Sequence, residues 1–314
     1  MNKKVAGIVA AAAVILIGGA YFLKGGNKVE AENNKSVVKE ITHKYGTTKI
    51  EGTPKKVVVL DYGTLDALDA LDVEVAGLPK SGKIPSYLEK FKGDSYGNTG
   101  SVKEPDLEAI HALEPDVIFM AGRMADYYDE LSDIAPTVYI ESDGANYMKT
   151  FSESMNVYGE IFDKKEKADE LVKEVTVKAE EAKAKTENLN ASAVMVNGRS
   201  LSAFGAKSRY GLLFNELGFK EADSNLGEST HGQEISFEYL IEKNPEYIFV
   251  VDRNAIVGSS EITAKDVVEN ELVKQTDAYK NGRIVYLNPI TWYTVSGGYT
   301  STLNMIEEVN KAIK

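Results

Sequence analysis

Cysteine is absent from all 314 residues of the sequence. Its absence excludes disulfide bonds, thiol nucleophiles, iron–sulfur clusters and zinc sites with cysteine ligands. It also excludes a lipid anchor attached to an N-terminal cysteine. Histidine is scarce, with three residues, and no two of them form an HExxH motif or an i,i+4 pair. A metal site built from histidine alone is therefore not expected.

Positive charge is also in short supply. The 36 Lys and Arg residues face 48 Asp and Glu residues, which gives a net charge of −12, and only five of the basic residues are arginine. This balance argues against nucleic acid as a partner. The catalytic motifs GxSxG and GxGxxG and the P-loop are missing as well. We therefore expect a protein that is not an enzyme, with a membrane-anchored hydrolase as the least favoured alternative.

The N-terminal segment has the pattern of a targeting signal. Lys3 and Lys4 precede an uncharged run over residues 5–23, which as a helix would be about 28 Å long and would just span a bilayer core. One interpretation is an uncleaved signal anchor, oriented by the two lysines. The other is a signal peptide cleaved after Ala31. Both place the rest of the chain outside the cytoplasm, and the first leaves it tethered to the cell membrane.

Beyond the linker, short apolar runs alternate with amphipathic segments, which predicts an α/β fold with mostly parallel sheets. The expected strands cover residues 56–60, 73–77, 116–120, 137–140, 192–196, 247–251 and 284–287. Residues 147–188 lack proline and are rich in Lys, Glu and Ala, so we expect one long helix, with residues 159–163 as the place where it would kink or break. The predicted parts are a signal or anchor with its linker at 1–35, an N-terminal lobe at 36–146, the connecting helix at 147–188 and a C-terminal lobe at 189–314.

The second half of the chain repeats part of the first. Residues 107–120 align with residues 237–250, and both segments read as a helix, a proline and a buried strand. The same register places Glu108 on Glu238 and Arg123 on Arg253. A duplicated lobe explains both coincidences. Two α/β lobes joined by a helix predict a ligand cleft between the lobes, at the carboxyl ends of the strands.

Four of the five arginines follow strands or lie in loops at this end of the lobes. They are Arg123, Arg199, Arg209 and Arg253, whereas Arg283 precedes a strand and is expected at the opposite end. Arginine binds planar anionic oxygens in a bidentate manner and stays charged when it loses water. An arginine-lined cleft in an acidic protein indicates a small ligand with several negative charges.

Two further polar side chains are candidates for the same cleft. His231 lies in a polar loop that resembles no core element, and Tyr293 stands next to Trp292, the sole tryptophan, after the last strand. A phenolate is a hard oxygen donor suited to Fe(III), and an imidazole nitrogen can serve as a second ligand. We therefore consider His231 and Tyr293 as an iron-binding pair, with Trp292 beside them.

These segments resemble a known family. The two-lobe plan with a spanning helix is similar to the class III substrate-binding proteins of ABC importers. The segments FGAKSRYG (204–211), STHGQEISFEYLIEKNPEYIFVVDRN (229–254) and WYTVSGG (292–298) resemble the petrobactin- and catecholate-siderophore-binding group of FatB, CeuE and YclQ type. The resemblance covers nearly all of residues 40–314. The strand patterns are common to many proteins, whereas the last two of these segments are specific.

The resemblance implies a role for each candidate residue. His231 and Tyr293 match the pair that completes the coordination of Fe(III) when the siderophore leaves sites open. Arg123, Arg209 and Arg253 match the arginines that neutralise the ferric complex, and the match is weaker at Arg199. Glu108 and Glu238 match the two glutamates, one on each lobe, that dock on the permease.

The expected function is capture of an anionic ferric siderophore of the catecholate type, such as a petrobactin-like complex, outside the cytoplasm. The protein would deliver it to an ABC permease dimer that works with a cytoplasmic ATPase. We expect a monomer without a permanent cofactor, since Fe(III) enters and leaves with the siderophore. Haem and a citrate-type siderophore are the alternatives among large anionic chelates.

Overall fold

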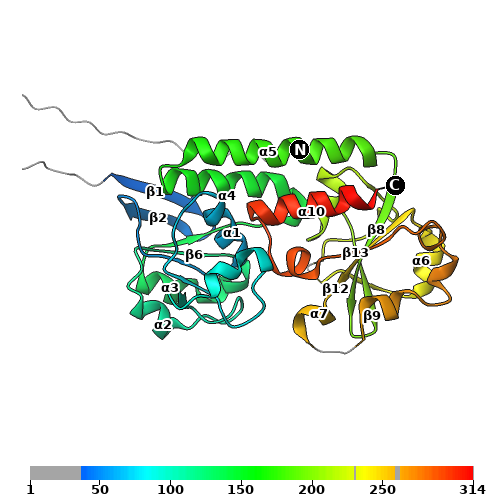
Figure 1. The fold of residues 1–314 in the computed structure, drawn as a ribbon, viewed down its shortest axis with the longest axis horizontal. Helices are drawn as coiled ribbons and strands as arrows, with labels where there is room; N and C mark the ends of the chain where they lie inside the picture. Colours follow the sequence, from blue (N-terminus) through cyan, green and yellow to red (C-terminus); the bar gives the residue numbers. More distant parts are fainter. Residues whose placement is uncertain (1–36, 230, 259–261, 314) are drawn as a thin grey trace, which may run out of the picture.

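The computed structural model describes residues 37–229, 231–258 and 262–313. Two α/β lobes lie side by side, and helices run along one edge of both (Figure 1). The N-terminal lobe has a five-stranded sheet in the order β5-β4-β3-β6-β7, with every pair parallel. Its strands are β3 (Val57–Val59), β4 (Gly77–Leu78), β5 (Gly97–Asn98), β6 (Val117–Met120) and β7 (Thr137–Tyr139). Its helices are α1 (Tyr62–Ala70), η1 (Ser86–Lys92), α2 (Leu107–Ala112), η2 (Gly122–Tyr127) and α3 (Tyr128–Ile134).

The C-terminal lobe has a six-stranded mixed sheet in the order β11-β9-β8-β12-β13, with β10 paired to β8. Its strands are β8 (Asn190–Asn197), β9 (Ser200–Phe204), β10 (Lys220–Glu221), β11 (Gln233–Ile235), β12 (Tyr247–Asp252) and β13 (Ile284–Leu287). Its helices are η4 (Leu212–Glu216), α6 (Phe237–Lys243), α7 (Asn254–Val257), α8 (Ala264–Val268), η5 (Val273–Gln275), α9 (Asp277–Lys280), η6 (Ile290–Thr294) and α10 (Tyr299–Ala312). The pairs β8–β12, β12–β13 and β10–β8 are parallel, whereas β9 and β11 are antiparallel additions at one edge.

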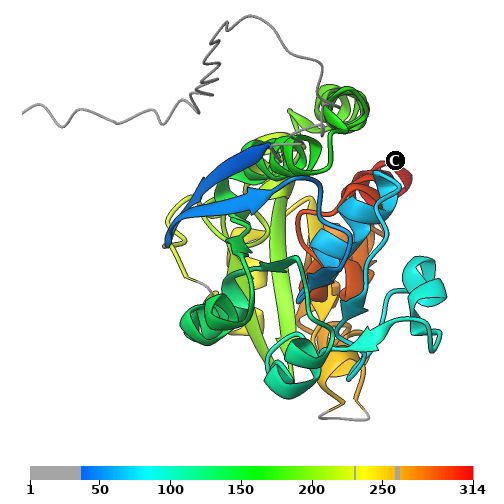
Figure 2. The same ribbon diagram turned by 90° about the vertical axis from the view of Figure 1, so that its left-hand side faces the viewer.

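Two hairpins were not predicted. β8 turns into β9 through Gly198, whose φ of +61° suits glycine in a tight turn. β1 (Val38–His43) and β2 (Gly46–Glu51) form a separate antiparallel pair, which Figure 2 shows beside the helices of the long edge. Every strand pair of the N-terminal sheet and three of the five pairs of the C-terminal sheet are parallel, so the expectation of mostly parallel sheets is confirmed.

Residues 147–188 form two helices rather than one, with the break that the sequence allowed near residues 159–163. α4 (Tyr147–Ile161) and α5 (Lys165–Thr186) pack against each other as an antiparallel hairpin (Figure 1). Asp163 at the turn has a φ of +56°, and its carboxylate accepts hydrogen bonds from Lys39 and Thr53 at 2.8 Å each. The break falls where the sequence placed it, and α5 alone runs from the N-terminal lobe to the C-terminal lobe.

One hydrophobic core extends through both lobes. It includes Val57 and Phe119 of the N-terminal sheet, Tyr158 of α4, and Ala193 and Phe249 of the C-terminal sheet. The outer face of each sheet is covered by a separate, smaller core. The lobes therefore share packed interior on the side of α4, α5 and α10, which limits how far they can move apart.

The last helix returns to the N-terminal lobe. α10 packs against α1 and α5, and Asp66 of α1 accepts the backbone N–H groups of Thr300 and Ser301 at 3.0 and 2.7 Å. Asp66 is 1% exposed, and burial raises the pKa of its carboxyl while these hydrogen bonds lower it. The first turn of α10 is thus capped by a side chain from the other lobe.

The sequence repeat is visible in local geometry. Asp106 and Ser236 cap the helices of the two copies, and each accepts a backbone N–H three residues on. Glu114 and Asn244, which precede the two repeated prolines, have left-handed φ values of +48° and +39°. These shared details support a duplicated lobe.

Nothing in the described part of the chain is a candidate for a membrane span, since none of its helices is long and apolar enough to cross a bilayer. The predicted signal or anchor at residues 5–23 and the cleavage site at Ala31 lie outside the described residues.

Candidate functional site

Tyr293 lies on a short π-helical turn between the two lobes. The turn, η6 (Ile290–Thr294), follows β13 and Asn288, whose side-chain oxygen accepts the N–H groups of Ile290 and Thr291 at 3.0 and 3.3 Å. Trp292 points into the core and is 3% exposed, whereas Tyr293 is partly exposed. Single turns of π-helix occur often at functional sites.

Three arginines surround Tyr293. Arg253 donates from Nε to the phenol oxygen at 3.0 Å, and Arg209 donates from Nη2 to the backbone carbonyl at 2.8 Å. Arg123 donates to the same carbonyl at 2.7 Å and to the carbonyl of Thr294 at 2.9 Å. The guanidinium carbon of Arg209 is 4.4 Å from the centre of the Tyr293 ring, and those of Arg123 and Arg253 are each 5.9 Å away. We call Arg123, Arg209, Arg253 and Tyr293 the arginine cluster.

The fold explains the convergence. Arg123 lies shortly after the end of β6, and Arg253 directly follows β12. These are the repeated strands of the two lobes. Arg209 comes from the loop between β9 and η4. This loop lies tight against the N-terminal lobe, because a Cβ atom at Gly144 would be 2.5 Å from the Cα atom of Arg209. Three of the four predicted cleft arginines therefore meet at one point between the lobes.

The cluster concentrates positive charge. Burial lowers the pKa of Arg123, and the neighbouring charge of Arg209 lowers it further. Burial alone would raise the pKa of the Tyr293 phenol, but the hydrogen bond and charge of Arg253, with the charge of Arg209, bring it below its ordinary value. The Nε of Arg209 is buried and has no hydrogen-bond partner in the described structure. A buried unpaired donor in a cluster of cations favours an anionic acceptor.

Two residues at this site were missed by sequence reasoning. Asn197 accepts from Nη1 of Arg253 at 2.5 Å, and its place directly after the 192–196 strand could have indicated it. Asp61, two residues after the end of β3, caps α1 by accepting the backbone N–H of Thr64 at 2.7 Å. Burial raises the pKa of Asp61, whereas its hydrogen bonds from Thr64 and the charge of Arg123 lower it.

Three predicted ligand-binding residues lie elsewhere. Arg199 is exposed on the turn between β8 and β9 and is not part of the arginine cluster, because the hairpin carries it past the end of β8. Trp292 is a core residue that packs near Tyr210 and donates to Glu308. It therefore supports the turn that carries Tyr293 from the protein interior and does not line the site. His231 is exposed on the loop before β11, and only its backbone N–H has a described partner, Ser229 Oγ at 3.3 Å. The structure does not place His231 against Tyr293.

The predicted docking glutamates occupy matching positions. Glu108 and Glu238 are exposed in the first turns of α2 and α6, one on each lobe. The backbone N–H of Glu238 and the hydroxyl of Ser236 hold the pKa of the Glu238 carboxyl below its usual value. Arg283 lies at the opposite end of β13, 4.0 Å from Glu246, as its sequence position predicted.

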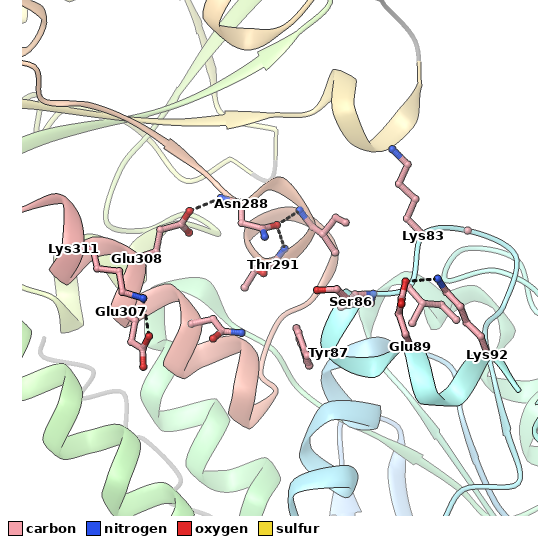
Figure 3. Close-up of a pocket in the computed structure, with 15 residues that line it drawn as sticks. Lys83, Ser86, Tyr87, Glu89, Lys92, Asn288, Thr291, Glu307, Glu308 and Lys311 are labelled. Atoms are coloured by element: carbon pink, nitrogen blue, oxygen red, sulfur yellow. Dashed lines mark hydrogen bonds and ion pairs between the residues drawn. The ribbon is translucent and has the colours of Figure 1, made fainter.

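A groove of about 670 Å³ separates the lobes on another side of η6 (Figure 3). It is lined from the N-terminal lobe by residues of the η1 region, among them Lys83 and Tyr87, and from the other side by Asn288, Thr291 and Glu308. No arginine lines it. Across the described residues, no group of three or more His, Asp or Glu side chains could hold a metal ion, which leaves the arginine cluster as the chemically distinctive site.

Known proteins resemble this chain in sequence and in fold. The petrobactin-binding protein YclQ of Bacillus subtilis is 43% identical over 289 residues, covering 91% of this chain and 90% of that protein. Its crystal structure superposes with a TM-score of 0.85 and covers 88% of this chain. The ferric-anguibactin-binding protein FatB of Vibrio anguillarum is 35% identical over 278 residues, which cover 86% of each chain.

A further solved structure is that of the siderophore-binding protein BauB with two molecules of acinetobactin and ferric iron. It is 36% identical, has a TM-score of 0.81, and covers 88% of this chain and 99% of its own. The family model described as periplasmic binding protein matches residues 57–291. The chain therefore belongs to the periplasmic binding protein family.

Proposed function

We propose that the protein captures a ferric siderophore of the catecholate type, in the manner of a petrobactin-like complex, and delivers it to an ABC permease. The observation that carries this proposal is the arginine cluster. Three guanidinium groups from two lobes and one loop meet around a single phenol. An anionic iron chelate that enters between the lobes would meet all three at once.

The chemistry of the cluster suits such a ligand. Catecholate oxygens around Fe(III) carry negative charge and accept hydrogen bonds, and Arg209 has a buried donor to spare. The lowered pKa of Tyr293 favours its phenolate, which is a good oxygen ligand for Fe(III). His231 would serve as a second protein ligand after a movement of its exposed loop. The two would bind iron when the chelator supplies fewer than six donor atoms.

The same proposal accounts for the remaining parts of the chain. Relatives that bind petrobactin and anguibactin favour a catecholate-type ligand over haem or citrate. The segment at residues 5–23 would place the protein outside the cytoplasm and, if it stays uncleaved, tether it to the membrane. Glu108 and Glu238 would each contact one subunit of the permease dimer, and a monomer suffices for this task. The protein binds its ligand without turnover.

The test is a titration of the purified protein with ferric petrobactin, a ferric hydroxamate, ferric citrate and haem. Trp292 is the only tryptophan and lies beside Tyr293, so quenching of its fluorescence reports binding directly. We expect saturable quenching that is strongest for ferric petrobactin, together with a visible charge-transfer band. Tighter binding of citrate, hydroxamate or haem, or hydrolysis of the added siderophore, would contradict the proposal.

A further inference from the structure

Glu308 holds the loop that presents Tyr293. Its Oε1 accepts the backbone N–H of Asn288 and its Oε2 accepts the indole N–H of Trp292, both at 2.8 Å. Figure 3 shows Glu308 on α10 reaching toward Asn288 at the start of the loop. One carboxylate therefore fixes two points, on either side of the first turn of η6.

These two points determine how η6 is turned. Asn288 caps the turn through Ile290 and Thr291, so fixing its backbone fixes the start of η6. Trp292 is held in the middle of η6, with its ring 6.4 Å from that of Tyr210. Tyr293 is the next residue, and a rotation of η6 would carry its carbonyl and phenol away from the arginines.

The contact is specific to Glu308. The neighbouring Glu307 is exposed and pairs with Lys311 at 3.0 Å, one turn along α10, and it has no described hydrogen bond to η6. Glu308 itself lines the groove of Figure 3, whereas none of the arginines does so. It therefore acts on the arginine cluster only through Asn288 and Trp292.

We propose that Glu308 is a positioning residue, which locks η6 so that Tyr293 faces Arg123, Arg209 and Arg253. The proposal rests on the function proposed above for that cluster, because it concerns how the same site is kept ready for its ligand. In this proposal Glu308 makes no direct contact with the ligand. It contributes the two hydrogen-bond acceptors that set the orientation of Tyr293.

The test compares Glu308→Gln with the matched control Glu307→Gln. Glutamine has the same shape but replaces one acceptor oxygen by an NH₂ group, so one of the two bonds is lost. In the ligand-free protein we expect a shifted emission maximum of Trp292 for Glu308→Gln. We also expect the Tyr293 phenol, followed by NMR of ζ-carbon-labelled tyrosine and assigned with Tyr293→Phe, to titrate at a higher pH than in the wild type.

Binding of ferric petrobactin should weaken about tenfold in Glu308→Gln, the loss of roughly one charge-assisted hydrogen bond. It should stay unchanged in Glu307→Gln. Trp292→Phe breaks the same link from the other side, and because this variant has no tryptophan, its affinity and that of the double variant are measured by the visible charge-transfer band of the bound complex. The double variant Glu308→Gln/Trp292→Phe should therefore be no weaker than the weaker single variant, because both remove one interaction. Additive losses would mean that the two residues act separately and would overturn the proposal.

Equal tyrosine titration and equal affinity in the Glu308 and Glu307 variants would also overturn it. Thermal unfolding shows whether Glu308→Gln also lowers the stability of the fold. A variant that is only less stable would still titrate Tyr293 at the wild-type pH while it is folded. That result would equally contradict the positioning role. If the tyrosine titration shifts as expected while even the wild type binds no ferric siderophore, the positioning role is supported and the proposed ligand is wrong.

Discussion

Arg123 and Tyr293 belong to different lobes, yet they are joined by a hydrogen bond of 2.7 Å from Nη2 to the backbone carbonyl oxygen. Arg209 donates to the same oxygen. In this structure a backbone carbonyl of the protein thus accepts the guanidinium N–H groups that we expect to bind the ligand. Ligand binding at this site is then an exchange of hydrogen bonds, and only the difference between the two sets contributes to affinity.

The arginine cluster should determine affinity for charge. Substituting Arg123, Arg209 or Arg253 by alanine should each weaken ferric-catecholate binding by about 1–3 kcal/mol, the range for hydrogen bonds to charged groups. Arg199→Ala should have a smaller effect, because Arg199 is exposed on the β8–β9 turn. Titration by Trp292 fluorescence measures each value. Arg283→Ala is the control at the far end of the lobe, and a loss there as large as at the cluster would refute the assigned geometry.

The phenol of Tyr293 should lose its proton at a lower pH than free tyrosine, whose pKa is about 10. The nearby positive charges stabilise the phenolate, so removing one must raise the pKa. Arg253→Ala removes both a hydrogen bond and a charge and should give the largest upward change. NMR titration of labelled tyrosine checks this. If Arg253→Ala leaves the Tyr293 titration where it was, the charge of the cluster does not act on the phenol.

His231 and Tyr293 should matter most when the siderophore supplies too few donors. A tetradentate bis-catecholate leaves two positions of an octahedral iron open, whereas a hexadentate tris-catecholate leaves none. The double variant His231→Ala/Tyr293→Phe should therefore lose more affinity for the tetradentate complex and shift its visible band. The tris-catecholate complex is the internal control. An unaltered spectrum of the tetradentate complex would show that the protein does not coordinate iron.

Glu108 and Glu238 should act in delivery rather than capture. Both are exposed and one lies on each lobe, so charged contacts with a two-fold permease would orient the complex. Alanine at both positions should slow siderophore-dependent growth while leaving ligand affinity intact, with the double variant slower than either single one. Glu114→Ala, which only breaks an exposed pair with Lys56, is the control. Wild-type uptake by a well-expressed double variant would instead favour a helix-capping role, since an acidic residue also stabilises the first turn of a helix.

The stability of the fold should be sensitive to a side chain at Gly63. A Cβ atom there would collide with the backbone carbonyl oxygen of Ser296, in the loop that follows Tyr293. Backbone cannot turn aside as a side chain can, so Gly63→Ala should destabilise the fold by roughly 1–3 kcal/mol. Chemical unfolding measures this change. Gly227→Ala is the matched control, because nothing lies within 4 Å of its added atom, and an equal loss of stability there would contradict the argument.

The sequence predicted the parts of the fold that depend on local pattern. Buried parallel strands such as β6 and β12 are continuous apolar runs, and the arginines after them must lie at the carboxyl edge of their sheets. The position of the break between α4 and α5 was predicted, but the reversal of the chain there was not. The left-handed Asp163 at the turn is held by tertiary partners, Lys39 and Thr53, which local pattern does not reveal.

The sequence indicated which arginines meet at the site, but it did not indicate the contacts that they make there. Arg123, Arg209 and Arg253 were found by their places in the chain, but the carbonyl of Tyr293 that Arg123 and Arg209 share as an acceptor has no signature in sequence. The supporting role of Trp292 depends on Glu308, a glutamate indistinguishable in sequence from its exposed neighbour. Contacts of this kind arise only when distant segments pack.

The cap that Asp66 places on α10 also bears on the order of synthesis. Asp66 leaves the ribosome 234 residues before Thr300, the first of its two donors. A nascent chain therefore holds a carboxylate that cannot be buried with its partners until α10 has begun to form, since burial without partners is costly. The N-terminal lobe, although it is made first, is completed only when this later helix docks on it.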